Sequence, residues 1–371
     1  MSLAVVLAQV VRARGDRAEA ARLYRLAAEA GEAAASNDLG VMAAEDGDLT
    51  AAEAHYRRAV DAGVGPATHN LAVLVWERGD PEQAESLFRR AADAGSALSM
   101  NELGVLLSDR GAHDEAEVQF RRAAGLDNPQ AANNLGRLIE ERAPQEAEQL
   151  YRTALRHHSA EARYNLAELL ARQGRHPESE KLHRQGAAAG DPLAMNCLGL
   201  LHAGRGDYAG AARWYERAIA GGNINSLYNF GLVRGKQGRA AEEELYRRAI
   251  EAGQPNALNA LAVVLDERGA KEEAERLYRD AITAGITDGL CNLAMLLQED
   301  GRIDEATRFY RRAVEAGDAK AMNNLGLLSF DQGDPDAAET LFRSGLAAGN
   351  ESAAVNLLLL LTGRLNPDTP E

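Results

Sequence analysis

A leucine that recurs at an almost constant interval constrains the fold of this chain more than any other feature. The interval is about 32 residues, a length typical of repeat architectures, and it is shorter by a single residue at two steps. The recurring positions are Leu7, Leu39, Leu71, Leu103, Leu135, Leu166, Leu198, Phe230, Leu261, Leu293, Leu325 and Leu357. Roughly half a repeat after each of the first eleven lies a second recurring position, usually aromatic: Tyr24, Tyr56, Phe88, Phe120, Tyr151, His183, Tyr215, Tyr246, Tyr278, Tyr310 and Phe342. This spacing predicts about 11.5 helix-turn-helix repeats, that is, eleven helix pairs and one unpaired helix.

Each unit has the pattern of two helices. Gly or Ala follows most of the recurring leucines, where a small residue lets a neighbouring helix approach closely. A glycine then marks the turn, as the end of a helix prefers. The second helix places Ala84, Phe88 and Ala91 at i, i+4 and i+7, which is one buried face. Eight of the ten prolines fall where a helix would begin, so the pattern predicts an all-α fold.

The second helices also carry a regular charge pattern. A glutamate stands four residues before an arginine in eight of them, the orientation that favours ion pairs on an exposed helix face. The pairs are Glu53–Arg57, Glu85–Arg89, Glu117–Arg121, Glu148–Arg152, Glu180–Arg184, Glu243–Arg247, Glu275–Arg279 and Glu339–Arg343. We interpret this face as the solvated outside of the array.

These features together resemble a known repeat family. A unit such as AMNNLGLLSFDQGDPDAAETLFRSGLAAGN is similar to a tetratricopeptide repeat, although that family's usual period is slightly longer, at about 34 residues. The junction between units, A-A-x-A-G followed by A-x-x-N-L-G, resembles Sel1-like repeats. The resemblance covers residues 1 to about 363.

The resemblance implies an architecture and a broad role. It implies a right-handed α-solenoid, in which stacked helix pairs form a superhelix and the first helix of each pair lines the concave groove. We therefore expect one solenoid domain over residues 1–363 and a disordered tail over 364–371. Such repeats act as recognition scaffolds for many partners, so the resemblance predicts the fold more narrowly than the function.

Composition narrows the classes of partner. The chain has 56 acidic and 41 basic residues and a net charge of −15, which disfavours nucleic acid and anionic membrane surfaces. Its two cysteines, Cys197 and Cys291, have no neighbours at metal-ligand spacing and form no disulfide framework. No stretch is long and apolar enough to span a membrane. A cytoplasmic protein with no cofactor and no metal is the expectation.

A row of asparagines is the main candidate for a binding surface in the groove. Every unit from the second onward has Asn one or two residues before the recurring leucine. One interpretation is that the amides bind the backbone of an extended peptide, and the other is that they bond carbonyls of the preceding junction. The asparagines that lie two residues before the leucine are expected to face the groove more squarely than those that lie one residue before it. The set is Asn37, Asn70, Asn101, Asn133, Asn134, Asn165, Asn196, Asn229, Asn259, Asn292, Asn323, Asn324 and Asn356.

Aromatic residues interrupt the polar groove at five places. A helical wheel places residues five before, two before, two after and five after the leucine on the side that faces the groove. The aromatic side chains at such positions are His69, Trp76, Tyr164, Tyr228 and Phe330. They are candidate anchors for a ligand, or else half-buried packing. A clamp for a C-terminal carboxylate is disfavoured, because among the basic residues only Arg137 occupies a suitable position.

The sequence offers no support for catalysis. It contains no phosphate loop, nucleophile elbow or dinucleotide fingerprint, and His176 and His183 lack the further ligands of a metal site. The leading hypothesis is a non-enzymatic adaptor that holds a peptide or protein segment in its groove. The alternatives are a regulatory sensor module of a larger signalling protein and a helical-repeat RNA binder, which the charge disfavours. The apolar first and last helices, LAVVLAQVV and VNLLLLL, are candidates for self-association.

Overall fold

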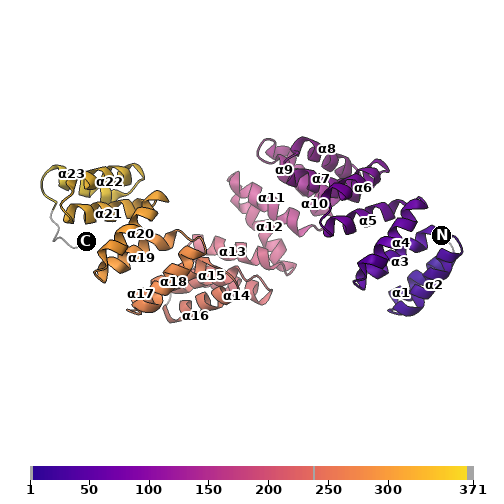
Figure 1. The fold of residues 1–371 in the computed structure, drawn as a ribbon, viewed down its shortest axis with the longest axis horizontal. Helices are drawn as coiled ribbons and strands as arrows, with labels where there is room; N and C mark the ends of the chain where they lie inside the picture. Colours follow the sequence, from indigo (N-terminus) through magenta and orange to yellow (C-terminus); the bar gives the residue numbers. More distant parts are fainter. Residues whose placement is uncertain (1–2, 237–238, 366–371) are drawn as a thin grey trace. The chain divides into compact units, whose positions relative to one another are not determined.

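The predicted all-α fold is confirmed. The computed structural model describes residues 3–236 and 239–365, which form 23 helices and no strand (Figure 1). The first helices of the units are α1 (Leu3–Ala13), α3 (Ala33–Glu45), α5 (Gly65–Glu77), α7 (Ala97–Asp109), α9 (Pro129–Ile139), α11 (Ala160–Arg172), α13 (Pro192–Gly204), α15 (Ser226–Gly235), α17 (Asn256–Glu267), α19 (Asp288–Glu299), α21 (Ala319–Asp331) and α23 (Glu351–Leu361). The second helices are α2 (Arg17–Glu29), α4 (Leu49–Asp61), α6 (Pro81–Asp93), α8 (His113–Ala124), α10 (Pro144–Arg156), α12 (His176–Ala188), α14 (Tyr208–Ala220), α16 (Arg239–Glu251), α18 (Lys271–Thr283), α20 (Ile303–Glu315) and α22 (Pro335–Ala347).

The chain separates into two compact units, Met1–His183 and Arg184–Glu371, called unit 1 and unit 2 below. Within each, helices pack against their neighbours in the chain: α7 contacts α6 and α8 in unit 1, and α19 contacts α18 and α20 in unit 2. A single domain over residues 1–363 stays a prediction. Of the expected tail, residues 366–371 lie outside the described residues.

In six repeats the core contains an aromatic ring packed against a glycine. Phe120 in α8 is 2% exposed, and its ring lies against Gly104 in α7. A Cβ atom added at Gly104 would lie 2.5 Å from Cε1 of Phe120, which is closer than real Cβ atoms come. The same close approach occurs at five further glycines after the recurring position: Gly40, Gly136, Gly199, Gly231 and Gly326. The small residue is therefore required by the ring, which explains why a poor helix former recurs inside a helix.

Turns lie at the predicted glycines that belong to the described part of the chain. Gly79 has a φ of 83°, a left-handed conformation that a glycine adopts without steric strain. Asp127 (φ 59°) and His158 (φ 61°) take this conformation at two junctions that have no glycine there. The predicted turn glycine Gly238 lies outside the described residues. The repeat near Pro144 is one residue shorter than most others, and its first helix, α9, ends earlier, at Ile139.

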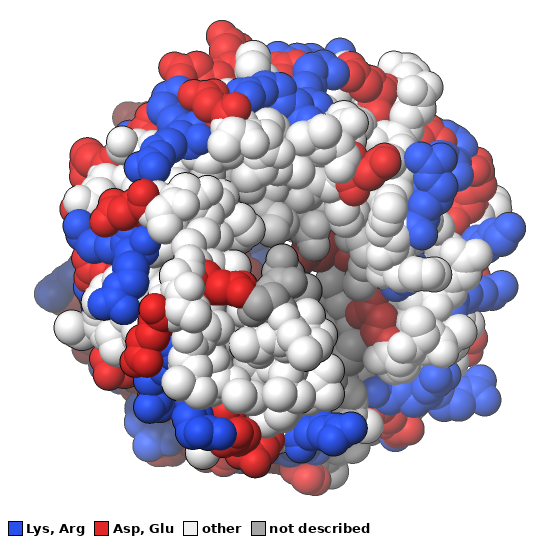
Figure 2. All heavy atoms as spheres, turned by 90° about the vertical axis from the view of Figure 1, so that its right-hand side faces the viewer, with Lys and Arg blue, Asp and Glu red and all other residues white. Residues whose placement is uncertain are grey.

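Ion pairs form along the second helices and link several of them to the turn of the following repeat. Seven of the predicted pairs are formed, with N–O distances of 2.7–3.0 Å. Several of these glutamates also bind an arginine from the following repeat, which the sequence pattern did not predict: Glu53–Arg78, Glu85–Arg110, Glu117–Arg142, Glu148–Arg175, Glu243–Arg268 and Glu275–Arg302. Figure 2 views the side of α1 and α2 and shows charges of both signs intermixed around the margin of this face. No helix among the described residues has the length and apolarity needed to cross a membrane.

Lowering the pH is expected to weaken these ion pairs. Hydrogen bonds from Arg57, Arg247 and Arg302 lower the pKa of Glu53, Glu243 and Glu275, respectively. A carboxyl group whose pKa is lower in the folded state stabilises the fold above its unfolded pKa of about 4.3. That stabilisation is lost as the pH falls through the folded pKa. We expect the triple variant E53Q/E243Q/E275Q to lose less stability than the wild type between neutral pH and pH of about 3, by up to about 1 kcal/mol per pair.

The measurement is urea denaturation followed by circular dichroism at several pH values. A matched control is E29Q/E251Q/E315Q, since these three glutamates are exposed, end their second helices and have no ion pair among the described residues. The control should keep the pH dependence of the wild type. If the two triple variants respond to pH alike, the outer ion pairs do not contribute to stability.

Candidate functional site

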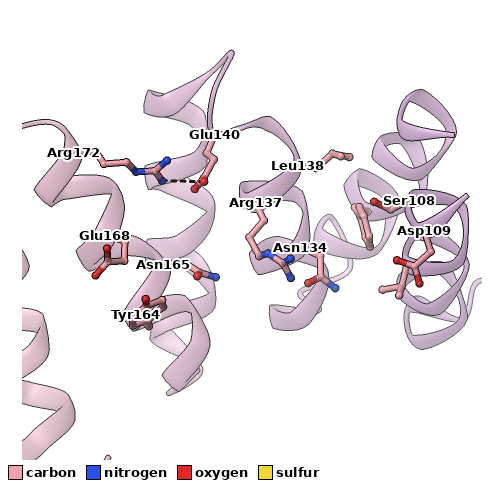
Figure 3. Close-up of a pocket in the computed structure, with 12 residues that line it drawn as sticks. Ser108, Asp109, Asn134, Arg137, Leu138, Glu140, Tyr164, Asn165, Glu168 and Arg172 are labelled. Carbon is pink, nitrogen blue, oxygen red and sulfur yellow. Dashed lines mark ion pairs between the residues drawn. The ribbon is translucent and has the colours of Figure 1, made fainter. Parts of the chain in front are cut away.

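Residues on the inner side of the first helices line a cavity of about 660 Å³ in unit 1. The cavity extends across α7, α9 and α11 (Figure 3). We number positions from the recurring leucine, so that position −1 precedes it and position +2 lies two residues after it. Most lining residues occupy positions −1, +2, +5 and +6: Asn134, Asn165, Val105, Arg137, Glu168, Ser108, Glu140, Asp109 and Arg172, with Tyr164, Leu138 and Phe120 completing the wall.

Arg137 is the central basic group of this cavity. Its side chain is exposed, and it has no ion pair among the described residues. Figure 3 shows Arg137 between the amides of Asn134 and Asn165, with Asp109 and Glu168 toward opposite ends of the cavity. A guanidinium group carries five N–H donors and stays protonated at any physiological pH. The centre of the cavity therefore offers an unneutralised cation, while its ends carry carboxylates.

The other arginine of the cavity is already bound within the protein. Arg172 in α11 lies 2.9 Å from a carboxylate oxygen of Glu140, just after α9. The hydroxyl of Tyr151 donates a hydrogen bond of 2.8 Å to the same carboxylate. Burial of the ring and this hydrogen bond raise the pKa of Tyr151, so the phenol stays protonated and keeps donating. This group forms a fixed wall of the cavity and leaves Arg137 as the available cation.

The asparagines form hydrogen bonds with one another across the repeats. The amide nitrogen at position −1 of one unit donates to the amide oxygen at position −2 of the preceding unit. We call these residues the amide row. The six pairs, donor first, are Asn70–Asn37 (2.9 Å), Asn134–Asn101 (3.0 Å), Asn165–Asn133 (2.8 Å), Asn229–Asn196 (3.1 Å), Asn292–Asn259 (3.2 Å) and Asn356–Asn323 (2.8 Å). The partner is therefore a neighbouring amide, where we had expected a junction carbonyl or a ligand.

Burial reverses the expected order of exposure in four of the six pairs of the amide row, whereas Asn37 and Asn259 are half-buried like their partners. Asn101, Asn133, Asn196 and Asn323, all at position −2, are buried, whereas the residues at position −1 are half-buried. The expectation that position −2 faces the groove more squarely is wrong for these residues. A wheel drawn for one isolated helix leaves out the first helix of the next repeat, which covers position −2. The amides that reach the cavity are Asn134 and Asn165 at position −1.

A signal for this pairing is present in the sequence. Each Asn at position −2 is followed, one repeat later, by Asn at position −1 of the next unit. Where position −2 is another residue, the next position −1 is not Asn, except at Asn324, which follows Cys291. Such linked occurrence indicates that the two positions touch. The remaining donor and acceptor groups of these amides can bind a ligand, and that role stays a prediction.

His69 and Trp76 in α5 line a second cavity of unit 1, of about 560 Å³, together with Val73, Glu77 and Glu102. Nδ1 of His69 lies 3.0 Å from the hydroxyl oxygen of the buried Ser99 in α7. Trp76 packs edge to face on Phe88, with ring centroids 6.0 Å apart. Both predicted anchors are therefore fixed by packing on one side and border open space on the other.

The three remaining aromatic residues differ in surroundings. Tyr164 lines the cavity around Arg137, and its ring centroid lies 6.4 Å from that of His183. Tyr228 in unit 2 packs beside Tyr246 at 6.0 Å. Phe330 packs on the cluster of Ala338 and Phe342, so its surroundings are those of a packing residue. A cavity of about 340 Å³ in unit 2 has none of the predicted aromatic residues in its wall, which includes Asn324.

Comparison with known family models shows to which protein family the chain belongs. A tetratricopeptide-repeat model matches residues 5–64, 69–134, 137–192 and 291–353, which is more than half of the sequence. A second model of the same description matches residues 193–222 and 256–284. The chain belongs to the tetratricopeptide-repeat family. A search of curated proteins finds no match.

Two solved structures, the first two described here, show the same fold for this tetratricopeptide-repeat protein. One is c5321, a protective antigen of uropathogenic Escherichia coli strains with an SLR fold: it is 22% identical, the match covers 94% of this chain and 84% of c5321, and the TM-score is 0.64. The human IFIT1 dimer with m7Gppp-AAAA is 14% identical over 90% of both chains, with a TM-score of 0.53. A Sel1 repeat protein from Oxalobacter formigenes is 25% identical over 58% of this chain and 99% of its own, with a TM-score of 0.49.

The histidines of this tetratricopeptide-repeat protein do not form the pair that sequence spacing allowed. His176 at the start of α12 is exposed, whereas His183 is buried. A separation of seven residues places both near one face of a helix, but the packing of α12 turns only His183 inward. His183 instead lies beside the ring of Tyr164.

Proposed function

We propose that the chain is a non-enzymatic, cytoplasmic scaffold that holds an extended segment of a partner protein against the inner side of its first helices. The observation that carries this proposal is the cavity around Arg137, where an unpaired guanidinium group lies between two half-buried amides among the described residues. A carboxylate of the bound segment pairs with Arg137. The free donor and acceptor groups of Asn134 and Asn165 bind its backbone.

The floor of the groove supports a peptide ligand. Position +2 holds Val41, Val73 and Val105 in the preceding first helices, and all three are half-buried. Apolar side chains of a peptide would cover these residues, while the amides at position −1 satisfy its backbone. Apolar contacts supply affinity and the few polar groups fix orientation, as in most binding sites.

An RNA ligand is the second candidate, because the IFIT1 structure contains m7Gppp-AAAA. The cavity of this chain argues against phosphates. Besides Arg137 it carries the carboxylates of Asp109 and Glu168, and Arg172 is neutralised by Glu140. The net charge of −15 adds long-range repulsion. A regulatory sensor module within a larger signalling protein is a further alternative, and it would use the same groove.

Self-association through the first and last helices also stays a proposal. In α1, Leu3, Leu7 and Val10 are exposed, with Leu3 at 84%. In α23, Leu358 and Leu361 are 62% and 57% exposed. Apolar faces of this kind often mark interaction surfaces.

The experiment that tests the scaffold function selects ligands from a displayed library of random peptides on the full chain. Affinities of the enriched peptides are then measured for the wild type and for Arg137→Ala. Because a hydrogen bond to a charged group is worth roughly 1.5–3 kcal/mol, Arg137→Ala should weaken binding about 10-fold or more. An adenosine oligonucleotide with a 5′-triphosphate is measured in parallel.

The matched control is Arg58→Ala, because Arg58 in α4 is also exposed and has no ion pair among the described residues, but it does not line the cavity. It should bind the selected peptides as the wild type does. Equal binding by Arg137→Ala would move the site away from this cavity. Binding of the oligonucleotide in place of any peptide would support the RNA alternative.

A further inference from the structure

The amide row is interrupted between α5 and α7, where the second cavity of unit 1 lies. The two positions that are Asn in six other pairs are His69 and Glu102 here. The same wall holds Trp76 at position +5 and Glu77 at position +6. Among all the units of the sequence, only this one combines an aromatic residue at +5, an acid at +6 and an acid at −1 of the next unit.

The cavity is negatively charged. Glu77 is exposed and Glu102 half-buried, and no Lys or Arg is among the lining residues that the structure describes. Burial lowers the pKa of His69, so its ring is neutral at pH 7 and does not offset the carboxylates. One oxygen of Glu102 accepts a hydrogen bond of 3.1 Å from the amide of Asn101, which holds this carboxylate in the wall.

Trp76 supplies an aromatic surface beside the two carboxylates. The indole is half-buried, and its edge-to-face contact with Phe88 restricts its rotation. Cations bind favourably over aromatic rings, most of all over Trp. The chain itself contains this contact elsewhere, since the guanidinium carbon of Arg217 lies 4.6 Å from the ring centroid of Trp214.

We propose that the cavity formed by His69, Val73, Trp76, Glu77 and Glu102 binds a lysine or arginine side chain of the partner segment. The apolar stem of such a side chain lies along Val73 and the indole, and its charged end meets the two carboxylates. The proposal rests on the scaffold function, but its site is separate from the cavity around Arg137. The proposal therefore predicts that the partner segment contains a lysine or an arginine.

The test uses the two tryptophans as reporters. Their indole N–H signals are recorded by NMR on the full chain and assigned with Trp214→Phe. The probes are the capped tripeptides Ac-Ala-Arg-Ala-NH₂ and Ac-Ala-Gln-Ala-NH₂, which differ only in the central side chain. The arginine peptide should shift the Trp76 signal saturably and leave that of Trp214 in place, and the glutamine peptide should shift neither.

Removing both carboxylates should weaken this binding. Because two ion pairs with the arginine are lost, Glu77→Gln/Glu102→Gln should raise the dissociation constant about 5- to 20-fold. The matched control is Glu267→Gln, which removes one carboxylate at the same position +6 of α17. It should bind as the wild type does.

Two results would overturn the proposal: equal shifts with the arginine and glutamine peptides, or unchanged affinity of the double variant. Both substitutions preserve side-chain volume, and an unchanged circular dichroism spectrum confirms that the variant is folded. Failure here together with an intact effect of Arg137→Ala on the selected peptides rejects the basic-residue site alone. Loss of both effects rejects the groove as the binding surface.

Discussion

Replacing Phe120 by Ala is expected to lower the free energy of unfolding by about 3–5 kcal/mol. The ring is 2% exposed and lies against the backbone of Gly104, where even one added carbon atom would clash. Because the glycine has no side chain, nothing at Gly104 can expand into the space that the ring leaves. The cavity therefore stays open, and the lost contacts are not regained.

The matched control is Phe309→Ala. Phe309 in α20 also belongs to a second helix, but it is half-buried, and the guanidinium groups of Arg279 and Arg312 lie 5.5 Å from its ring centroid. Its removal should cost about 1 kcal/mol. Urea denaturation of the full chain, followed by circular dichroism, compares the two variants. Equal losses would contradict the view that the ring-on-glycine contact is the main stabilising contact of the repeats that contain it.

The fold was predictable from the sequence because the same local sequence signals recur in each repeat. Leu103 and Gly104 mark one helix, a turn glycine ends it, and Phe120 marks the next. Each of these signals is weak in a single unit. Repetition at an almost constant interval makes chance agreement negligible. In repeat arrays each repeat contacts mainly its neighbours, so local signals determine most of the fold.

The site was predictable only in part, because it depends on how neighbouring first helices pack. The positions +2 and +5 of single helices gave Arg137 and Trp76 as inner residues, and both line cavities. Glu102 was missed as a site residue, since its role depends on Trp76 in the preceding repeat. The same limitation applies to Asn133, which the following repeat covers. Contacts between repeats appear in the sequence only as linked pairs of positions.

The second large expected effect is a loss of unfolding free energy when a hydrogen bond of the amide row is removed. Asn133 is 2% exposed, and its amide oxygen accepts a hydrogen bond of 2.8 Å from Asn165. Asn133→Ala leaves that donor without its partner in a half-buried junction, which should cost about 1–3 kcal/mol of unfolding free energy. The double variant Asn133→Ala/Asn165→Ala should lose less than the sum of the single variants, with a coupling of about 1 kcal/mol.

Asn324 is the matched control because it lies outside the linked pairs. Its amide oxygen accepts a longer hydrogen bond of 3.3 Å from Asn323, and the residue lines the cavity of unit 2. Asn324→Ala should change stability by less than about 0.5 kcal/mol. The coupling decides between the two interpretations of the amide row. A coupling near about 1 kcal/mol means that the amides first join the repeats and offer a ligand only their remaining groups. If the coupling is zero and Asn165→Ala binds the selected peptides more weakly, the amide row serves to bind the ligand and does not join the repeats.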